Sequence, residues 1–227
     1  MRLFQSMCRA SGSITVFVRL AVALGSFLLS GCSGFKEIDT HTTHGGWVTI
    51  EASDDGAPFE ILARKLSDSP LFEYQIKSEL GLSASACQAA LRRGIRLLAA
   101  GLDGDEYPVY QIVYESVDSL LTYVIHDEPF PFKNTEMVVR YDYYLHEDGQ
   151  MGVTWKEAWD EYDVRPSSKL SRVETFRGSW NFAPVTDHTT NAIHTVQFDP
   201  KGMPRWLAEP MLIKFMKDSF EKVLAHQ

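Results

Sequence analysis

The sequence lacks several features that define common classes of protein. It contains no G-x-S-x-G nucleophile motif, no H-E-x-x-H or C-x-x-C motif, and no glycine-rich loop of the kind that binds phosphates or dinucleotides. Its most apolar run, residues 20–29, is about half as long as the roughly 20 residues that a membrane-spanning helix needs. We therefore expect a protein that is not an enzyme, that uses no metal or cofactor, and that has no permanent transmembrane helix.

Acidic residues are absent from the first 31 positions, where three arginines precede the apolar run 20–29. A basic segment followed by a short apolar one is typical of a cleaved signal peptide. The run ends in Leu29-Ser30-Gly31-Cys32, which has the form of a bacterial lipobox: an aliphatic residue, two small residues, and a cysteine that receives acyl chains such as palmitate. Several acyl chains hold a protein on a bilayer far better than one chain does. We expect residues 1–31 to be removed and Cys32 to anchor the protein to a membrane; the alternative is an ordinary secretory signal with a chance cysteine.

Cysteine is scarce, with three residues in 227. Cys8 lies in the signal segment and Cys32 in the lipobox, so only Cys87 would remain and no intramolecular disulfide could form. The helical pattern around Cys87 favours a buried, small apolar side chain. The formal charge of −8 becomes −11 when the three arginines of residues 1–31 are removed, which argues against nucleic acid as a partner.

The chain divides into a signal peptide (1–31), a flexible tether (32–46) and one domain (47–227). The tether is polar and shows little periodicity, as expected of a segment that holds a domain away from a bilayer. Ser33, and not Asp, follows Cys32, which favours transfer to the outer membrane of a Gram-negative cell envelope. We expect the domain to face the periplasm.

Within the domain, alternation of apolar and polar residues predicts strands, and spacing of three to four predicts helices. A helix is expected over 84–100, with Ser83 as N-cap, Gly101 as the stop, and Arg92, Arg93 and Arg96 on a solvated face or, alternatively, on a patch for lipid headgroups. A broad apolar face predicts a second helix over 204–227. The predicted strands are 59–65, 71–80, 109–115, 120–126, 137–146, 152–159, 175–183 and 193–198. Successive antiparallel strands flanked by helices indicate an α+β domain.

Two motifs near the C-terminus resemble the closing signature of START domains, which are lipid-transfer modules. One is Trp180-Asn181-Phe182-Ala183-Pro184, and the other is Asp199-Pro200-Lys201-Gly202-Met203-Pro204-Arg205-Trp206-Leu207 ahead of the last helix. Upstream, Pro129-Phe130-Pro131-Phe132 followed by 136–140 is similar to the family's entry to a central strand, although Thr135-Glu136 stands where the family usually has Arg-Asp. The resemblance spans residues 47–227.

This resemblance implies a helix-grip fold, in which a curved antiparallel sheet and the long C-terminal helix enclose an apolar cavity for a hydrophobic lipid. Alternation predicts which side chains face inward, and it places Trp159 with Val153 and Trp155. Aromatic rings with one polar atom suit a mostly hydrocarbon ligand. The predicted cavity residues are Met137, Val139, Tyr141, Tyr143, Trp155, Trp180, Phe182, Leu212, Phe215 and Met216.

Three functions remain open from the sequence. The first is a membrane-tethered protein that binds or transfers a lipid. The second is an enzyme of the same superfamily, with cyclase or hydrolase chemistry and with Tyr123, His126 or His194 as proton donors. The third is a structural lipoprotein that binds another protein, in which case the aromatic residues would form an ordinary packed core.

Overall fold

The computed structural model describes residues 46–53, 59–67, 69, 71–103 and 107–225. The predicted signal peptide, the lipobox at Cys32 and nearly all of the predicted tether lie outside these residues. In chain order the elements are β1 (Val48–Ser53), β2 (Phe59–Lys65), β3 (Phe72–Leu80), α2 (Ala84–Ala99), β4 (Val109–Glu115), β5 (Ser119–His126), β6 (Thr135–Leu145), β7 (Met151–Glu157), β8 (Ser171–Arg172), β9 (Phe176–Thr186), β10 (Thr189–Phe198) and α3 (Arg205–Ala225).

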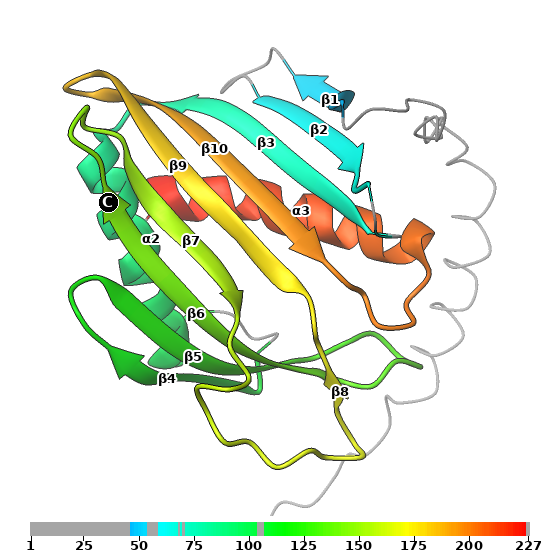
Figure 1. Cartoon of the computed structure of the whole chain (residues 1–227). Coiled ribbons are helices and arrows are strands. Elements are labelled where there is room, and N and C mark those ends of the chain that lie inside the picture. Colours follow the sequence, from blue (N-terminus) through cyan, green and yellow to red (C-terminus); the bar gives the residue numbers. More distant parts are fainter. Residues whose placement is uncertain (1–45, 54–58, 68, 70, 104–106, 226–227) are drawn as a thin grey trace, which may run out of the picture. The chain divides into compact units, whose positions relative to one another are not determined.

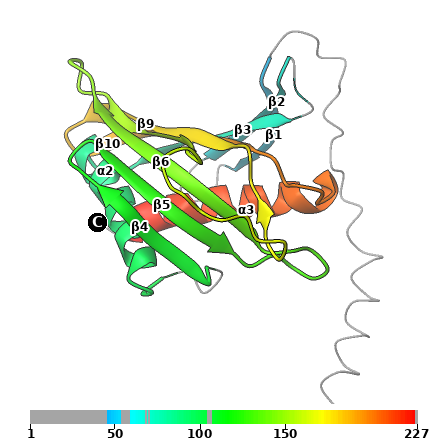
Figure 2. The same cartoon turned by 60° about the horizontal axis from the view of Figure 1, so that its bottom comes forward.

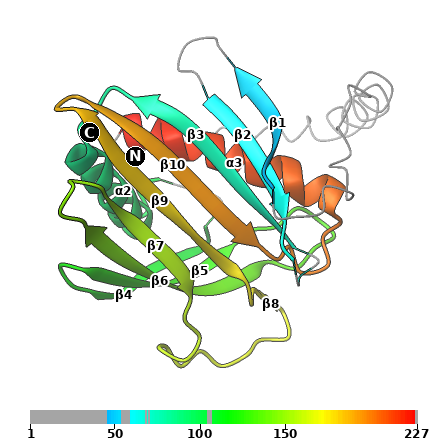
Figure 3. The ribbon, with the colours of Figure 1, turned by 45° about the horizontal axis from the view of Figure 1, so that its top comes forward.

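The strands form one sheet in the order β1-β2-β3-β10-β9-β7-β6-β5-β4. Every neighbouring pair along this path is antiparallel, and the two-residue β8 pairs in parallel with β6 beside it. The sheet curves around α3, which crosses its inner side, while α2 covers one end (Figures 1 and 2). Seen from the top, α3 runs along the inner side of β3 and β10 (Figure 3). The predicted α+β helix-grip fold is confirmed.

Local sequence signals explain where α2 begins and ends. The Ser83 hydroxyl accepts a hydrogen bond from the Ala86 amide at 3.2 Å, as an N-cap does. Gly101 has a φ of 67° and donates its amide to the Leu98 carbonyl, and the Leu102 amide bonds to the Leu97 carbonyl. This left-handed glycine stop satisfies the last carbonyl groups of the helix. The helix predicted over 84–100 is therefore confirmed.

One face of α2 is buried, and Cys87 lies on it as a fully buried free thiol. Burial raises the pKa of this thiol to about 11, so it remains protonated at neutral pH. The prediction that Cys87 is a small core residue is confirmed.

A second, smaller apolar cluster lies on the outer face of the sheet. Leu121, Val138 and Ala158 form its buried centre, and Trp159 and Tyr162 pack against it. The expectation that Trp159 shares a face with Val153 and Trp155 is therefore wrong. The reason is that β7 ends at Glu157, and the chain then turns across the outer face, where the Trp159 indole donates to the Val173 carbonyl at 2.8 Å.

The part of the chain that the structure describes contains no helix long and apolar enough to cross a membrane.

Candidate functional site

A cavity of about 320 Å³ lies between the inner face of the sheet and the two helices. Its volume is at the lower end of the range of roughly 300–1,000 Å³ that is usual for small-molecule sites. Strands β4, β5, β6, β7, β9 and β10 supply one side of the wall, and α2 and α3 supply the other. The cavity is therefore the space that the helix-grip arrangement encloses.

The wall contains most of the side chains that the sequence predicted for it. Alternation along β6 directs Met137, Val139 and Tyr141 inward, and the intervening residues outward. The predicted residues that line the cavity are Met137, Val139, Tyr141, Trp155, Trp180, Leu212 and Phe215. That a ligand contacts these residues remains a prediction.

Three predicted cavity residues lie outside the lining. Tyr143 is near the end of the sheet that α2 covers, and its ring packs under the guanidinium of Arg92 at 4.9 Å. Phe182 is fully buried and stacked on Trp180, with ring centroids 5.5 Å apart. Met216 is fully buried on α3, one position beyond Phe215, which lines the cavity. In each case tertiary packing fills the space that alternation or helical spacing alone would leave to the cavity.

Several wall residues were not predicted. Leu91, Ile95 and Leu98 bring the apolar face of α2 into the wall, and their helical spacing was a signal that could have identified them. Val153, which alternation placed on the inward face with Trp155, and Phe176, which it placed on one face with Trp180, also line the wall. The lining residues that were not predicted are Ala90, Gly94, Tyr107, Tyr110, Val124, His126, Glu128, Thr135, His194, Phe198, Met203, Ala208, Met211, Asp218, Ser219, Lys222 and Val223.

Trp155 can lie in the wall because the position opposite it has no side chain. It pairs with Gly178 of β9, and a Cβ at Gly178 would lie 2.5 Å from Cζ2 of the indole and 2.1 Å from the carbonyl oxygen of Thr195. Contacts this short are not tolerated, so only glycine leaves room for both the indole and the neighbouring strand. The indole also packs beside Tyr141 and Phe176, with centroid distances of 6.3 and 6.1 Å.

His194 of β10 is the most deeply buried polar group in the wall, with 1% of its surface exposed. Its ring stacks on Trp180 with centroids 4.2 Å apart and planes 10° apart, and Phe220 packs at 6.4 Å. Burial lowers its pKa to about 3, against the smaller opposing effect of a hydrogen bond to the Met216 backbone. The ring is therefore neutral at physiological pH.

Two nitrogen atoms in this wall have no hydrogen-bond partner among the described residues: Nδ1 of His194 and Nε1 of Trp155. The two rings are neighbours, with centroids 5.5 Å apart. Because Nδ1 of His194 is unpaired, we assign the hydrogen bond to the Met216 backbone to the Nε2 proton. Nδ1 is then an acceptor, whereas the indole Nε1–H is only a donor.

The other polar groups of the wall do have partners. The hydroxyl groups of Tyr110 and Tyr141 are hydrogen-bonded to each other, and burial raises the pKa of both. Glu128 accepts from the Thr135 hydroxyl at 2.8 Å and contacts Nδ1 of His126 at 3.2 Å. The tyrosine hydroxyl groups and the Glu128 carboxylate therefore each have a hydrogen-bond partner within the protein.

Comparison with known proteins identifies the architecture. A scan against models of protein families and a search of curated proteins find no match to the sequence. Solved structures do match: a STAR-related lipid transfer protein from Xanthomonas axonopodis is 19% identical, with a TM-score of 0.64, over 80% of this chain and 98% of that one. The lipid transfer and protein localization domain of human StarD13 is 12% identical, with a TM-score of 0.63, over 96% of this chain and 99% of that one. The chain has a START-like fold.

Human STARD10 is similar as well, with 16% identity and a TM-score of 0.61 over 79% of this chain and 73% of that one.

The START-like fold places Glu136, the acid at the strand entry noted in the sequence, outside the cavity. Glu136 is buried on the outer face of β6, where it bonds to Arg172 at 3.2 Å and to the Tyr123 hydroxyl at 3.3 Å. This acid therefore contributes to the outer cluster, and not to the cavity.

The START-like fold separates Tyr123 from the other two proton donors considered for an enzyme, since His126 and His194 both line the cavity and Tyr123 does not. Tyr123 lies on the outer face with Glu136, His126 lies beside Glu128, and His194 is stacked on Trp180. Over the residues with described positions, no group of three or more His, Cys, Asp or Glu side chains is arranged to hold a metal ion. The described side chains thus do not combine these three donors into one catalytic group.

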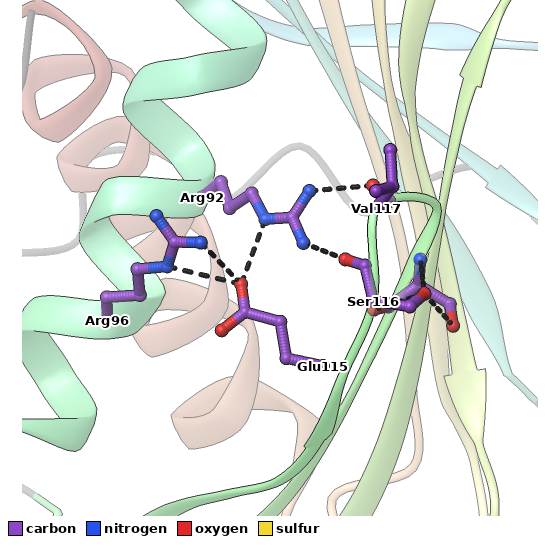
Figure 4. Close-up of polar contacts among 6 residues, drawn as sticks. Arg92, Arg96, Glu115, Ser116 and Val117 are labelled. Atoms are coloured by element: carbon purple, nitrogen blue, oxygen red, sulfur yellow. Dashed lines mark hydrogen bonds and ion pairs between the residues drawn. The ribbon is translucent and has the colours of Figure 1, made fainter.

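Arginines of α2 fix the helix to the β4–β5 hairpin of the START-like sheet (Figure 4). Arg92 bonds to Glu115 at 3.0 Å and to the carbonyl groups of Val117 and Ser116, while Arg96 bonds to Glu115 at 2.8 Å. These contacts lower the pKa of Glu115, chiefly through Arg96. Arg92 and Arg96 therefore do not form a purely solvated face: they join α2, which supplies part of the cavity wall, to the sheet.

Proposed function

We propose that this protein binds a hydrophobic lipid in its internal cavity and carries it at a membrane of the cell envelope. The observation that supports this most strongly is the cavity of about 320 Å³, whose wall is built mainly from aliphatic and aromatic side chains of both helices and six strands. Such a wall suits a ligand that is mostly hydrocarbon.

The similar structures add support from their fold. Two of them are named as lipid transfer proteins or domains, and they cover 80% and 96% of this chain. Fold alone does not assign a function. The cavity of this chain is therefore the main support for the proposal, and the similar structures favour lipid transfer as the function of that cavity.

A route for the ligand is suggested by α3. Met211 and Phe215 line the cavity, and they are also 36% and 39% exposed. Because these two side chains reach both the cavity and the surface, the cavity lies close to solvent at α3. A lipid could then pass from a bilayer to the cavity along apolar side chains.

The membrane anchor belongs to the same proposal. It rests on the lipobox 29–32 and on the polar tether that follows it. A protein held by acyl chains on Cys32 would keep the domain close to the bilayer from which it takes lipid. We place the anchored protein at the outer membrane, facing the periplasm.

Transfer can be tested with donor and acceptor vesicles. A fluorescent lipid is loaded in the donor vesicles, the purified full chain is added, and the appearance of the lipid in the acceptor vesicles is followed. Val139→Trp places a large ring in the cavity wall and should abolish transfer, because Val139 lines the cavity. Thr154→Trp is the matched control, since Thr154 is exposed on β7. Equal transfer by both variants would overturn the proposal.

A further inference from the structure

The cavity wall contains an acceptor and a donor that no other described group satisfies. His194 offers Nδ1, and Trp155 offers Nε1–H. Unpaired polar atoms are rare in protein interiors, because each one has lost its bonds to water and gained none in return. Both side chains are more than nine-tenths buried, at 1% and 6% exposure, and both line the cavity.

The positions of the two rings are fixed by the fold. His194 is held by its stacking on Trp180 and by its hydrogen bond to the Met216 backbone. Trp155 is held against Gly178, where the absence of a side chain leaves space for the indole. Because this donor and this acceptor are held in fixed positions, they favour a ligand group that can bond to both of them.

One chemical group fits both atoms. A hydroxyl can donate its proton to Nδ1 of His194 and, at the same time, accept from the Nε1–H of Trp155. The two rings are neighbours, with centroids 5.5 Å apart. A hydroxyl oxygen that lies between them would need to be about 3 Å from each nitrogen atom to bond to both. A carboxylate has no proton for Nδ1 and would bring a charge into the apolar wall.

We propose that the cavity selects lipids that carry an uncharged hydroxyl group, which bonds to Nδ1 of His194 and to Nε1–H of Trp155. This inference rests on the proposed lipid-binding function and specifies its ligand class. The polar atoms of Tyr110, Tyr141, Thr135 and Glu128 already have partners, whereas Nδ1 of His194 and Nε1 of Trp155 are buried atoms of the described wall that have none.

The test compares three probes of equal chain length on the purified full chain. 1-Dodecanol can donate and accept, dodecyl methyl ether can only accept, and dodecane can do neither. Binding is measured as the shift in melting temperature over a concentration series, since a ligand of the folded state stabilises it by mass action. We expect the alcohol to bind about tenfold more tightly than the ether, because the ether leaves Nδ1 unpaired.

Two variants separate the two hydrogen bonds. His194→Phe keeps a ring that can stack on Trp180 but has no hydrogen-bonding atom, so the preference for alcohol over ether should disappear. Trp155→Phe removes the donor together with part of the ring, so the preference for ether over dodecane should disappear while all three probes still bind. Thr154→Ala is the control, because Thr154 is exposed on β7 and does not line the cavity, so this variant should keep both preferences.

The outcomes distinguish this inference from the function on which it rests. If none of the probes binds, the proposed lipid-binding function fails, and the inference fails with it. If all three bind with equal affinity, the cavity accepts hydrocarbon but the hydroxyl inference is overturned. Loss of both preferences in Thr154→Ala would also contradict the proposal, because the selectivity would then not come from the two nitrogen atoms.

Discussion

The indole of Trp155 occupies the space where a side chain at position 178 would lie. Trp155 and Gly178 are directly paired between β7 and β9, and a Cβ at Gly178 would be 2.5 Å from the indole. A single glycine therefore fixes the position of a tryptophan in the cavity wall. This close approach links the stability of the sheet to the shape of the site.

Gly178→Ala should destabilise the domain by about 1–3 kcal/mol or more, because the added methyl group meets both the indole and the Thr195 carbonyl. Urea denaturation followed by tryptophan fluorescence measures the change. Gly81→Ala is the control, since a Cβ at Gly81 has no neighbour within 4 Å, and it should change stability by less than about 0.5 kcal/mol. Equal stabilities of the two variants would show that the contact at Gly178 is readily relieved.

Acidification should destabilise the protein through His194. Its pKa is about 3 in the folded chain, whereas that of an unfolded histidine is about 6.5. Between these values the unfolded chain binds a proton that the folded chain does not, so the free energy of unfolding falls as the pH falls below 6.5. The slope from this group is at most about 1.4 kcal/mol per pH unit.

His194→Gln removes the titrating group and keeps a side chain that can donate to the Met216 carbonyl. The stability of this variant should depend less steeply on pH between 6.5 and 3 than the stability of the wild type. Chemical denaturation at several pH values measures both slopes under the same conditions, so contributions from all other groups cancel. Identical slopes would show that His194 is not held neutral by the fold.

The Arg92 contacts should matter more for stability than those of Arg96. Arg92 bonds to Glu115 and to two backbone carbonyls, and it packs over the Tyr143 ring, whereas Arg96 is 57% exposed and bonds to Glu115. We expect Arg92→Ala to cost about 1–2 kcal/mol and Arg96→Ala less than about 1 kcal/mol. Thermal unfolding of both variants checks this order. The reverse order would assign the attachment of α2 chiefly to the Arg96–Glu115 ion pair.

Cys32→Ser should release the protein from membranes, because the acyl chains would have no attachment site. The variant should appear in the soluble fraction after a high-salt wash and should incorporate no labelled palmitate, while the wild type stays in the membrane pellet. Cys87→Ser is the matched control and should remain anchored, since Cys87 is buried in the domain. A Cys32→Ser protein that stays in the pellet and takes up palmitate would contradict the anchor.

Local sequence patterns predicted most elements of this fold, and the elements that they missed have physical explanations. The capping residues Ser83 and Gly101 define α2 because each satisfies the backbone by itself. Alternation found most strands but missed β1 as a separate element, and it missed β8, whose two residues are too few to show a period. Trp159 was assigned to the wrong face because nothing in its neighbourhood marks the end of β7 at Glu157.

Sequence patterns predicted less of the site, because the site depends on contacts between elements that are distant in the sequence. Alternation identified Met137, Val139 and Tyr141 as inward-facing, but it could not show that α2 closes the sheet near Tyr143. The unpaired nitrogen atoms of His194 and Trp155 belong to strands that are not sequence neighbours, and their proximity exists only after the sheet has formed. Recognition chemistry of this kind requires three-dimensional positions.

The most direct test of the central claim is to extract the purified full chain with organic solvent and to identify bound lipid by mass spectrometry. We predict a lipid at close to one molecule per protein in the wild type and in the exposed-site control Thr154→Trp. In Val139→Trp, whose added ring enters the cavity wall, this lipid should be absent while the melting transition remains cooperative. An equal amount of lipid in all three proteins, or none in the wild type, would contradict the account.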